Sequence, residues 1–176
     1  MKKLLFILPL LLFLKVSAQK IKSIERLSDH SSYVKGNNFE GVIFSENYFQ
    51  QSSDTAETKI KRFTPTVEDI ILAERILIKK GNDTTNKGDI LYIFNNLKKY
   101  HRQYIGYFNN KGERMIYVNC FQLDKDQLSE KIKKSARVPD WHNTLYIVDD
   151  GGRRYWQAHI NLDKKEINDI SVNGVA

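Results

Sequence analysis

The chain has one cysteine, Cys120, so no disulfide can form within it. Its fold must therefore rely on a hydrophobic core. Cys120 alternates with Ile116 and Val118 along one face of an expected strand, which predicts a buried and unreactive thiol. A nucleophilic role would need a nearby histidine to raise the thiolate fraction, and no cysteine-protease signature surrounds this residue.

Short catalytic and cofactor-binding motifs are also missing. The sequence has no G-x-S-x-G element, no P-loop and no dinucleotide-binding glycine pattern. A zinc site usually contains two His or Cys ligands three to five residues apart, and none of the four histidines has such a neighbour. We therefore expect no metal and no cofactor. The histidines are His30, His101, His142 and His159.

The N-terminal residues 1–18 have the three-part layout of a secretory signal. Lys2 and Lys3 form a basic head, an apolar run follows, and Val16 and Ala18 supply the small or short residues of a cleavage site. The apolar run has about eleven residues, whereas a membrane-spanning helix needs roughly 20. We predict cleavage before Gln19 and a periplasmic or secreted protein; the alternative is an uncleaved membrane anchor.

The remaining chain has neither a long apolar run nor a basic block, which predicts no stable membrane insertion after signal cleavage. Loss of Lys2, Lys3 and Lys15 lowers the formal charge from +7 to +4. That charge, without a basic cluster, argues against nucleic acid as a partner. We expect residues 19–62 to be irregular apart from one strand at 41–49, and to form one globular unit with an α+β domain at 63–176.

Two helices are predicted from apolar residues at helical spacing. The first covers 63–81, with Thr64 as its N-cap and Gly81 as its stop. The second begins near Asp89, and a weaker third helix is expected over 124–135. The remaining segments are predicted strands: 103–108 and 114–121 flank one hairpin loop, 144–149 and 153–162 flank a second, and a closing strand begins at residue 166.

Strands that follow the helices through short turns predict an α+β fold, with an antiparallel sheet of five to six strands and one or two long helices on one face. In layout such a domain resembles cystatin-like and PepSY-like folds, which often bind peptides or other proteins. The resemblance is one of layout, and no motif carries it.

The C-terminal hairpin is built on Gly151–Gly152, since a two-residue turn needs the positive φ values that glycine supplies. In the predicted register Asp150 faces Arg153 and Asp149 faces Arg154, which helps to fix the pairing. Alternation then separates two faces. The buried face comprises Leu145, Ile147, Trp156, Ala158, Ile160 and Leu162, and the outer face comprises Tyr146, Val148, Tyr155, Gln157, His159 and Asn161.

This outer face is the predicted binding surface, because its side chains combine aromatic surface area with polar ends that can form hydrogen bonds. An ordinary solvated sheet face is the alternative. The predicted binding residues are Tyr146, Arg153, Tyr155, Gln157 and His159.

In the first hairpin both faces are apolar enough to be buried, so its strands are expected to be central. One face is assigned Tyr104, Phe108, Met115, Tyr117 and Phe121, and the other Ile105, Tyr107, Ile116 and Val118. The side away from the helix is covered by a loop or lines an aromatic groove, and the sequence leaves both possibilities open.

Glu74 falls within the apolar stripe of the first helix. A buried carboxylate must be paired or protonated, and perturbed carboxylates are frequent in active sites. Three functions follow as hypotheses. The first is a non-enzymatic binding module of the cell envelope that recognises protein, peptide or glycan. The second is a small hydrolase using Glu74 or an Asp–His pair such as Asp140 and His142, and the third is a structural or immunity-type envelope protein.

Overall fold

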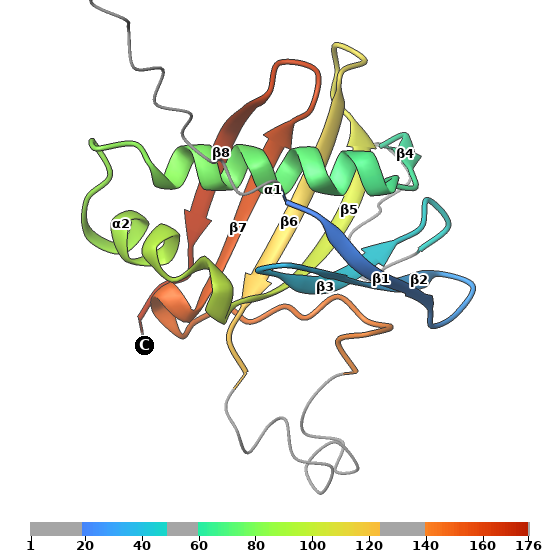
Figure 1. Cartoon of the computed structure of the whole chain (residues 1–176), viewed down its shortest axis with the longest axis horizontal. Coiled ribbons are helices and arrows are strands. Elements are labelled where there is room, and N and C mark those ends of the chain that lie inside the picture. Colours follow the sequence, from blue (N-terminus) through green and yellow to red (C-terminus); the bar gives the residue numbers. More distant parts are fainter. Residues whose placement is uncertain (1–18, 49–59, 124–139, 176) are drawn as a thin grey trace, which may run out of the picture.

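The computed structural model describes residues 19–48, 60–123 and 140–175, which form one mostly antiparallel sheet of eight strands with two α-helices (Figure 1). The predicted signal at 1–18 and the third helix expected over 124–135 lie outside the described residues. The elements are β1 (Ile21–Arg26), β2 (Ser31–Gly36), β3 (Glu40–Phe44), β4 (Arg62–Phe63), α1 (Val67–Gly81), α2 (Gly88–Asn95), η1 (Leu97–Lys99), β5 (His101–Phe108), β6 (Arg114–Phe121), η2 (Gly152–Arg154), β7 (Tyr155–Asn161) and β8 (Glu166–Val172).

The strands follow the order β1-β2-β3-β5-β6-β7-β8, and β4 pairs with β5. Neighbouring strands are antiparallel except β3 and β5, which are parallel. A parallel pair needs a long crossover connection, and the connection here includes α1 and α2. The predicted α+β fold with a mostly antiparallel sheet is therefore confirmed, with more strands than the five or six expected.

The additional strands come from residues 19–62, which we predicted to be irregular apart from one strand. β1 is the edge of the sheet and is exposed along almost its whole length, so its polar sequence lacks the alternation that marks a half-buried strand. The strand expected at 41–49 is β3, which ends at Phe44 because a turn follows.

α1 starts four residues later than the predicted range of 63–81, and its cap is Thr66 rather than Thr64. The Thr66 hydroxyl accepts a 3.2 Å bond from the Asp69 amide, and the Asp69 carboxylate accepts a 3.1 Å bond from the Thr66 amide. This reciprocal capping box satisfies two of the free amides at the start of the helix. Thr64 instead accepts a bond from the amide of Glu46. Gly81 is the last helical residue, and Asn82 caps the end.

The main core lies between the helices and one face of the sheet, over which α1 crosses (Figure 1). Ile70, Ala73 and Leu77 of α1 are fully buried there. No helix in the described part of the chain is long and apolar enough to span a membrane. Even-numbered residues of β7 face the main core, as we predicted. The buried apolar residues of this strand and the turn after it are Trp156, Ala158, Ile160 and Leu162. Asn161, which alternation assigned to the outer face, is also fully buried.

The strand predicted at 144–149 is not formed, and the predicted C-terminal hairpin is wrong. Residues 140–150, which we call the covering segment, have no strand structure (Figure 1). β7 pairs with β6 on one side and β8 on the other, so both of its edges are occupied. Gly151 and Gly152 do have positive φ values of 88° and 57°, but they lead into η2 rather than closing a two-stranded turn.

The covering segment packs on the sheet face opposite the helices and forms a second core with β3 and β6. Leu145 and Tyr146 are buried in this second core, whereas Ile147 is 56% exposed. The inward assignment of Ile147 and the outward assignment of Tyr146 are therefore wrong, and Leu145 is buried on the opposite side of the sheet from Trp156. Two buried amides hold the segment. Nε2 of Gln103 donates to the carbonyls of Trp141 (2.6 Å) and Thr144 (2.8 Å). The Tyr146 amide donates to Oε1 of Gln103 (2.8 Å), and Asn119 donates to the Tyr146 carbonyl (2.7 Å).

The β5–β6 hairpin has the predicted strands but a different division of its two faces. Phe108 pairs with Arg114 and Ile105 pairs with Tyr117, so odd-numbered residues of both strands share a face. Tyr104 therefore faces α1, and Tyr107 lies on the same side as Tyr117. The five-residue loop determines this register, since the strand ends on either side of it must pair.

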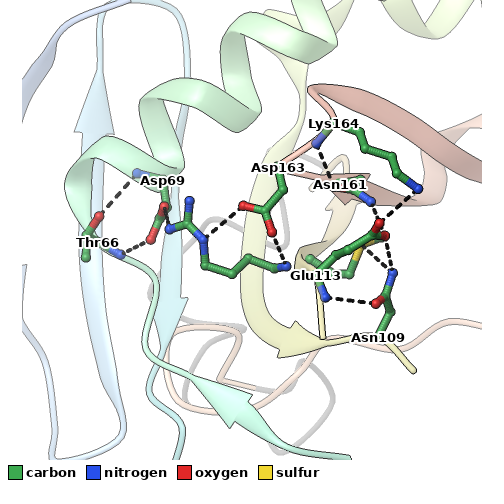
Figure 2. A network of polar contacts seen from close by, with 9 residues as sticks. Thr66, Asp69, Asn109, Glu113, Asn161, Asp163 and Lys164 are labelled. Atoms are coloured by element: carbon green, nitrogen blue, oxygen red, sulfur yellow. Dashed lines mark hydrogen bonds and ion pairs between the residues drawn. The ribbon is translucent and has the colours of Figure 1, made fainter. Parts of the chain in front are cut away.

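A polar network ties the start of α1 to the two turns at this end of the sheet (Figure 2). Arg114 contacts Asp69 of α1 at 2.9 Å and Asp163 of the β7–β8 turn at 3.2 Å. Beside it, Glu113 accepts hydrogen bonds from Asn109 and Asn161 and pairs with Lys164. Hydrogen bonds from Asn109 and Lys164 lower the pKa of Glu113 to about 2. These charges contact one another, which indicates a structural role.

Candidate functional site

Five residues on the sheet face opposite α1 form a partly exposed group beside the covering segment. Tyr117 of β6 and His159 of β7 are direct cross-strand partners, and Tyr107 of β5 reaches the same point from the next strand. Tyr155 and Gln157 precede His159 on the same face of β7, because alternate residues of a strand point the same way. We call these five residues the open patch.

His159 is the centre of the open patch. Its Nδ1 shares a 2.7 Å hydrogen bond with the hydroxyl of Tyr107, and the two rings meet edge to face with centroids 5.8 Å apart. The Tyr117 ring lies 5.2 Å from the imidazole on another side. Edge-to-face and tilted contacts of this kind stabilise aromatic groups in fixed orientations. The three side chains therefore form a preorganised unit on three neighbouring strands.

His159, Tyr107 and Tyr117 of the open patch favour their neutral forms. Burial lowers the pKa of His159, and the carboxylate of Asp169 on β8 opposes this effect. Burial also raises the pKa of Tyr107, and it raises the pKa of Tyr117 to about 12. At neutral pH the centre of the patch therefore presents phenols and an uncharged imidazole, which can stack on a ligand and exchange hydrogen bonds with it.

The structure keeps three of the five predicted binding residues together and places the other two elsewhere. Tyr155, Gln157 and His159 share the outer face of β7. Tyr146 is only 6% exposed, because it belongs to the covering segment and packs into the second core. The guanidinium of Arg153 lies 3.8 Å from the ring centroid of Tyr92 and 4.0 Å from Asp89, so it packs against α2.

Tyr107 and Tyr117 belong to the open patch, although alternation along the C-terminal strands did not predict them as binding residues. The length of the loop between β5 and β6 could have indicated that the two tyrosines share a face. Counting outward from the Phe108–Arg114 pair places Tyr107 and Tyr117 on one face. Their meeting with His159 depends in addition on the pairing of β6 with β7, which are separated in the sequence by the covering segment.

A second group of polar and aromatic residues lies where the covering segment meets β2, β3 and β5. Tyr33 donates a 2.6 Å hydrogen bond to Glu40, and the other oxygen of Glu40 is 3.2 Å from Nδ1 of His101. The indole of Trp141 lies between His101, at 5.0 Å, and His142, at 3.9 Å between ring centroids. Nδ1 of His142 is 3.5 Å from Asp140. The Asp140–His142 pair, at the start of the covering segment, thus lies beside a second carboxylate–imidazole pair, Glu40 and His101.

Glu74 is buried beneath α1 and paired. Its Oε1 lies 2.7 Å from Nε of Arg102 and accepts a 2.9 Å hydrogen bond from Tyr104. Burial raises the pKa of Glu74, while Arg102 and Tyr104 oppose that rise. The carboxylate lines neither the groove beside β8 nor the one between β1 and the start of α1. This placement matches the expected structural pairing and gives no support to Glu74 as a catalytic group.

Cys120 faces the helix-side core and is fully buried, as predicted. Burial raises the pKa of its thiol well above the usual range, so the thiolate is disfavoured. Within residues 19–48, 60–123 and 140–175, no three His, Cys, Asp or Glu side chains gather in a way that could hold a metal ion.

Comparison with known proteins adds no family to these observations. No protein-family model, curated protein or solved structure matches the chain.

Proposed function

We propose that the chain is a non-enzymatic binding module of the cell envelope that recognises a protein, peptide or glycan through the open patch. The observation that carries the proposal is the contact of Tyr107 and Tyr117 with His159 on three adjacent strands. Tyrosines on a rigid sheet supply contact area with little loss of side-chain entropy on binding. Their hydroxyls, together with the amide of Gln157, supply directional hydrogen bonds.

The neutral imidazole adds polarity without a charge. When the Tyr107 hydroxyl donates to Nδ1 of His159, the ring hydrogen is on Nε2, which is left as a donor for a ligand. An uncharged, hydrogen-bonding surface with aromatic faces suits the backbone of a peptide and the hydroxyls of a sugar alike. Ligand screening distinguishes these two.

The proposed location is the periplasm or the cell exterior, reached by cleavage of residues 1–18. The amino-terminal sequence of the protein recovered from a fractionated culture tests this part. A first residue of Gln19 in the exported fraction supports it, and full-length protein retained in the cytoplasm contradicts it.

Binding is tested with an immobilised oligosaccharide panel and a peptide library, followed by titration of each hit. The Tyr155→Ala/His159→Ala variant removes part of the open patch. We expect it to weaken binding about tenfold or more, which corresponds to loss of one or two contacts. The matched control, Tyr92→Ala/His30→Ala, removes the same residue types from α2 and the β1–β2 turn and should keep the affinity. If neither panel yields a ligand that distinguishes the two variants, the open patch is an ordinary solvated face.

A further inference from the structure

The outer edge of β8 is uncovered in the described part of the chain. β8 is the last strand of the sheet and hydrogen-bonds to β7 on its inner side. No other described backbone group bonds to residues 166–172. The register shifts between Ile167 and Asp169, so Asn168 is an extra residue without a partner in β7. Unpaired strand edges can accept a further strand.

A groove of about 410 Å³ runs along this edge. Four consecutive residues of β8, Ile167 to Ile170, line it. Ile167 and Ile170 pair with Ile160 and Ala158 and face the helices, whereas Asp169 pairs with His159 and faces the other side. A groove that all of them line therefore lies beside the strand edge rather than on one face. Ile90 of α2 adds apolar surface opposite Ile167 and Ile170. Figure 1 shows β8 next to the end of α1 and the start of α2.

The opposite wall of the groove is held in place by its own hydrogen bonds. It consists of the end of α1 and the loop that leads to α2. Asn86 is buried and donates a 2.7 Å bond to the carbonyl of Lys80. Asp83 accepts bonds from the amide and hydroxyl of Thr85 and pairs with Lys80 at 2.6 Å. A wall fixed in this way lowers the ordering cost of binding.

The charge of this wall indicates the chemistry of its ligand. Lys80 is paired with Asp83, but Lys87 is exposed and has no acidic partner among the described residues. Lys87 also stands at the start of α2, where no side chain caps the free amides. A lysine next to an uncapped helix start favours a carboxylate. The acidic residue of the β8 lining, Asp169, is the cross-strand partner of His159 and faces away from the helices. On the helix side the groove thus presents aliphatic surface beside the positive charge of Lys87.

We propose that the outer edge of β8 takes up an extended peptide segment of a partner protein, which adds a strand to the sheet. Alternate side chains of this segment enter the groove: aliphatic groups contact Ile90, Ile167 and Ile170, and an acidic group pairs with Lys87. At roughly 3.3 Å per residue, the four lining residues match a core of about four residues in the peptide. Main-chain hydrogen bonds provide affinity in this mode of recognition, and the pocketed side chains provide specificity.

The test uses a fluorescent heptapeptide of alternating valine and threonine with one central glutamate in the valine register, titrated against the purified protein. Two control peptides carry lysine in place of the glutamate, or N-methyl groups on the amides that would hydrogen-bond to β8. We expect the lysine peptide to bind about tenfold more weakly and the methylated peptide to lose binding, because the first loses an ion pair and the second the strand pairing.

Two protein variants separate this edge from other surfaces. Lys87→Glu should reverse the preference between the glutamate and lysine peptides, whereas Lys98→Glu in η1 should leave it unchanged. Amide chemical-shift changes should centre on residues 166–172. Absence of binding, binding that tolerates the methylated backbone, or shifts centred on the open patch would each overturn the proposal. The proposed function can fail without affecting this result, since the two surfaces share no residue.

Discussion

Nε of Arg102 lies 2.7 Å from Oε1 of Glu74 between β5 and α1, and both side chains are buried. Arg102 also donates a 2.7 Å hydrogen bond to the carbonyl of Tyr100. Two opposite charges therefore share the otherwise apolar space under the helix. Such a pair contributes little compared with an apolar pair of the same size, but loss of one partner leaves an uncompensated buried charge.

Glu74→Gln should accordingly lower the free energy of unfolding by about 3 to 5 kcal/mol, because Arg102 stays buried without its counter-charge. The double variant Glu74→Leu/Arg102→Met removes both charges and should recover most of this loss. Urea unfolding of the two variants and the parent measures both values. A double variant less stable than Glu74→Gln would show that the ion pair itself stabilises the fold.

Gln103 predicts a second measurable effect, because it holds the covering segment by three hydrogen bonds. Gln103→Leu leaves two carbonyls and one amide of that segment without their partner, which should cost about 2 to 4 kcal/mol. Hydrogen exchange at the Tyr146 amide should accelerate in the same variant. Gln157→Leu is the matched control, since Gln157 is half-buried and bonds to one residue, Asn173. Similar losses in both variants would contradict the anchoring role of Gln103.

The covering segment also shows why the sequence predicted only part of the fold. α1, β5 and β6 have strong periodic patterns, and the structure confirms them to within a few residues. Residues 144–149 carry a similar alternation, but the amides of Gln103 and Asn119 hold them on a sheet face. Those contacts join residues far apart in the sequence, and local periodicity does not report them. β1 was missed for the opposite reason, because an exposed edge strand has no apolar alternation.

The open patch was predicted in part for the same reasons. Alternation along β7 correctly placed Tyr155, Gln157 and His159 on one face. Tyr107 and Tyr117 join them through strand pairing across the sheet, which depends on loop length and on tertiary contacts. Alternation alone thus predicts which residues of one strand share a face, whereas their neighbours on other strands can be predicted only when the register of strand pairing is known.

Gly151 and Gly112 provide a matched pair of substitutions at positive φ. Both have left-handed backbone angles, 88° and 77°, but a Cβ at Gly151 would lie 2.6 Å from the Tyr155 ring, whereas one at Gly112 would meet nothing within 4 Å. Gly112→Ala should cost about 1 kcal/mol from backbone strain. Gly151→Ala should cost about 2 to 4 kcal/mol, because overpacking against Tyr155 is added.

Thermal unfolding of the two variants, with Gly151→Ala repeated in a Tyr155→Ala background, separates these contributions. Removal of the ring should reduce the cost of Gly151→Ala to that of Gly112→Ala. An unchanged cost in that background would assign the whole effect to the backbone.

Two of the partly buried histidines, His101 and His159, have lowered pKa values that predict how stability depends on pH. Burial lowers the pKa of both imidazoles below the usual 6.5. At His101 the positive charges of Arg102 and His142 lower the pKa further, and Glu40 opposes the shift. At His159 Asp169 opposes the shift. A histidine whose folded-state pKa is lowered binds its proton more readily in the unfolded chain. Stability is therefore complete above about pH 6.5, the ordinary value for histidine, and is lost as the pH falls through the folded-state pKa values.

Urea unfolding measured from pH 7.5 down to the pH at which carboxylates begin to titrate should show this fall in the free energy of unfolding. His101→Gln and His159→Gln should each reduce the slope of unfolding free energy against pH below 6.5, and together they should reduce it further. His30→Gln serves as the control because that side chain is exposed. A slope that persists in the double variant would show that other groups dominate the response. The His159→Gln variant also loses an imidazole that Tyr107 contacts, so its near-ultraviolet circular dichroism should change where that of His30→Gln does not.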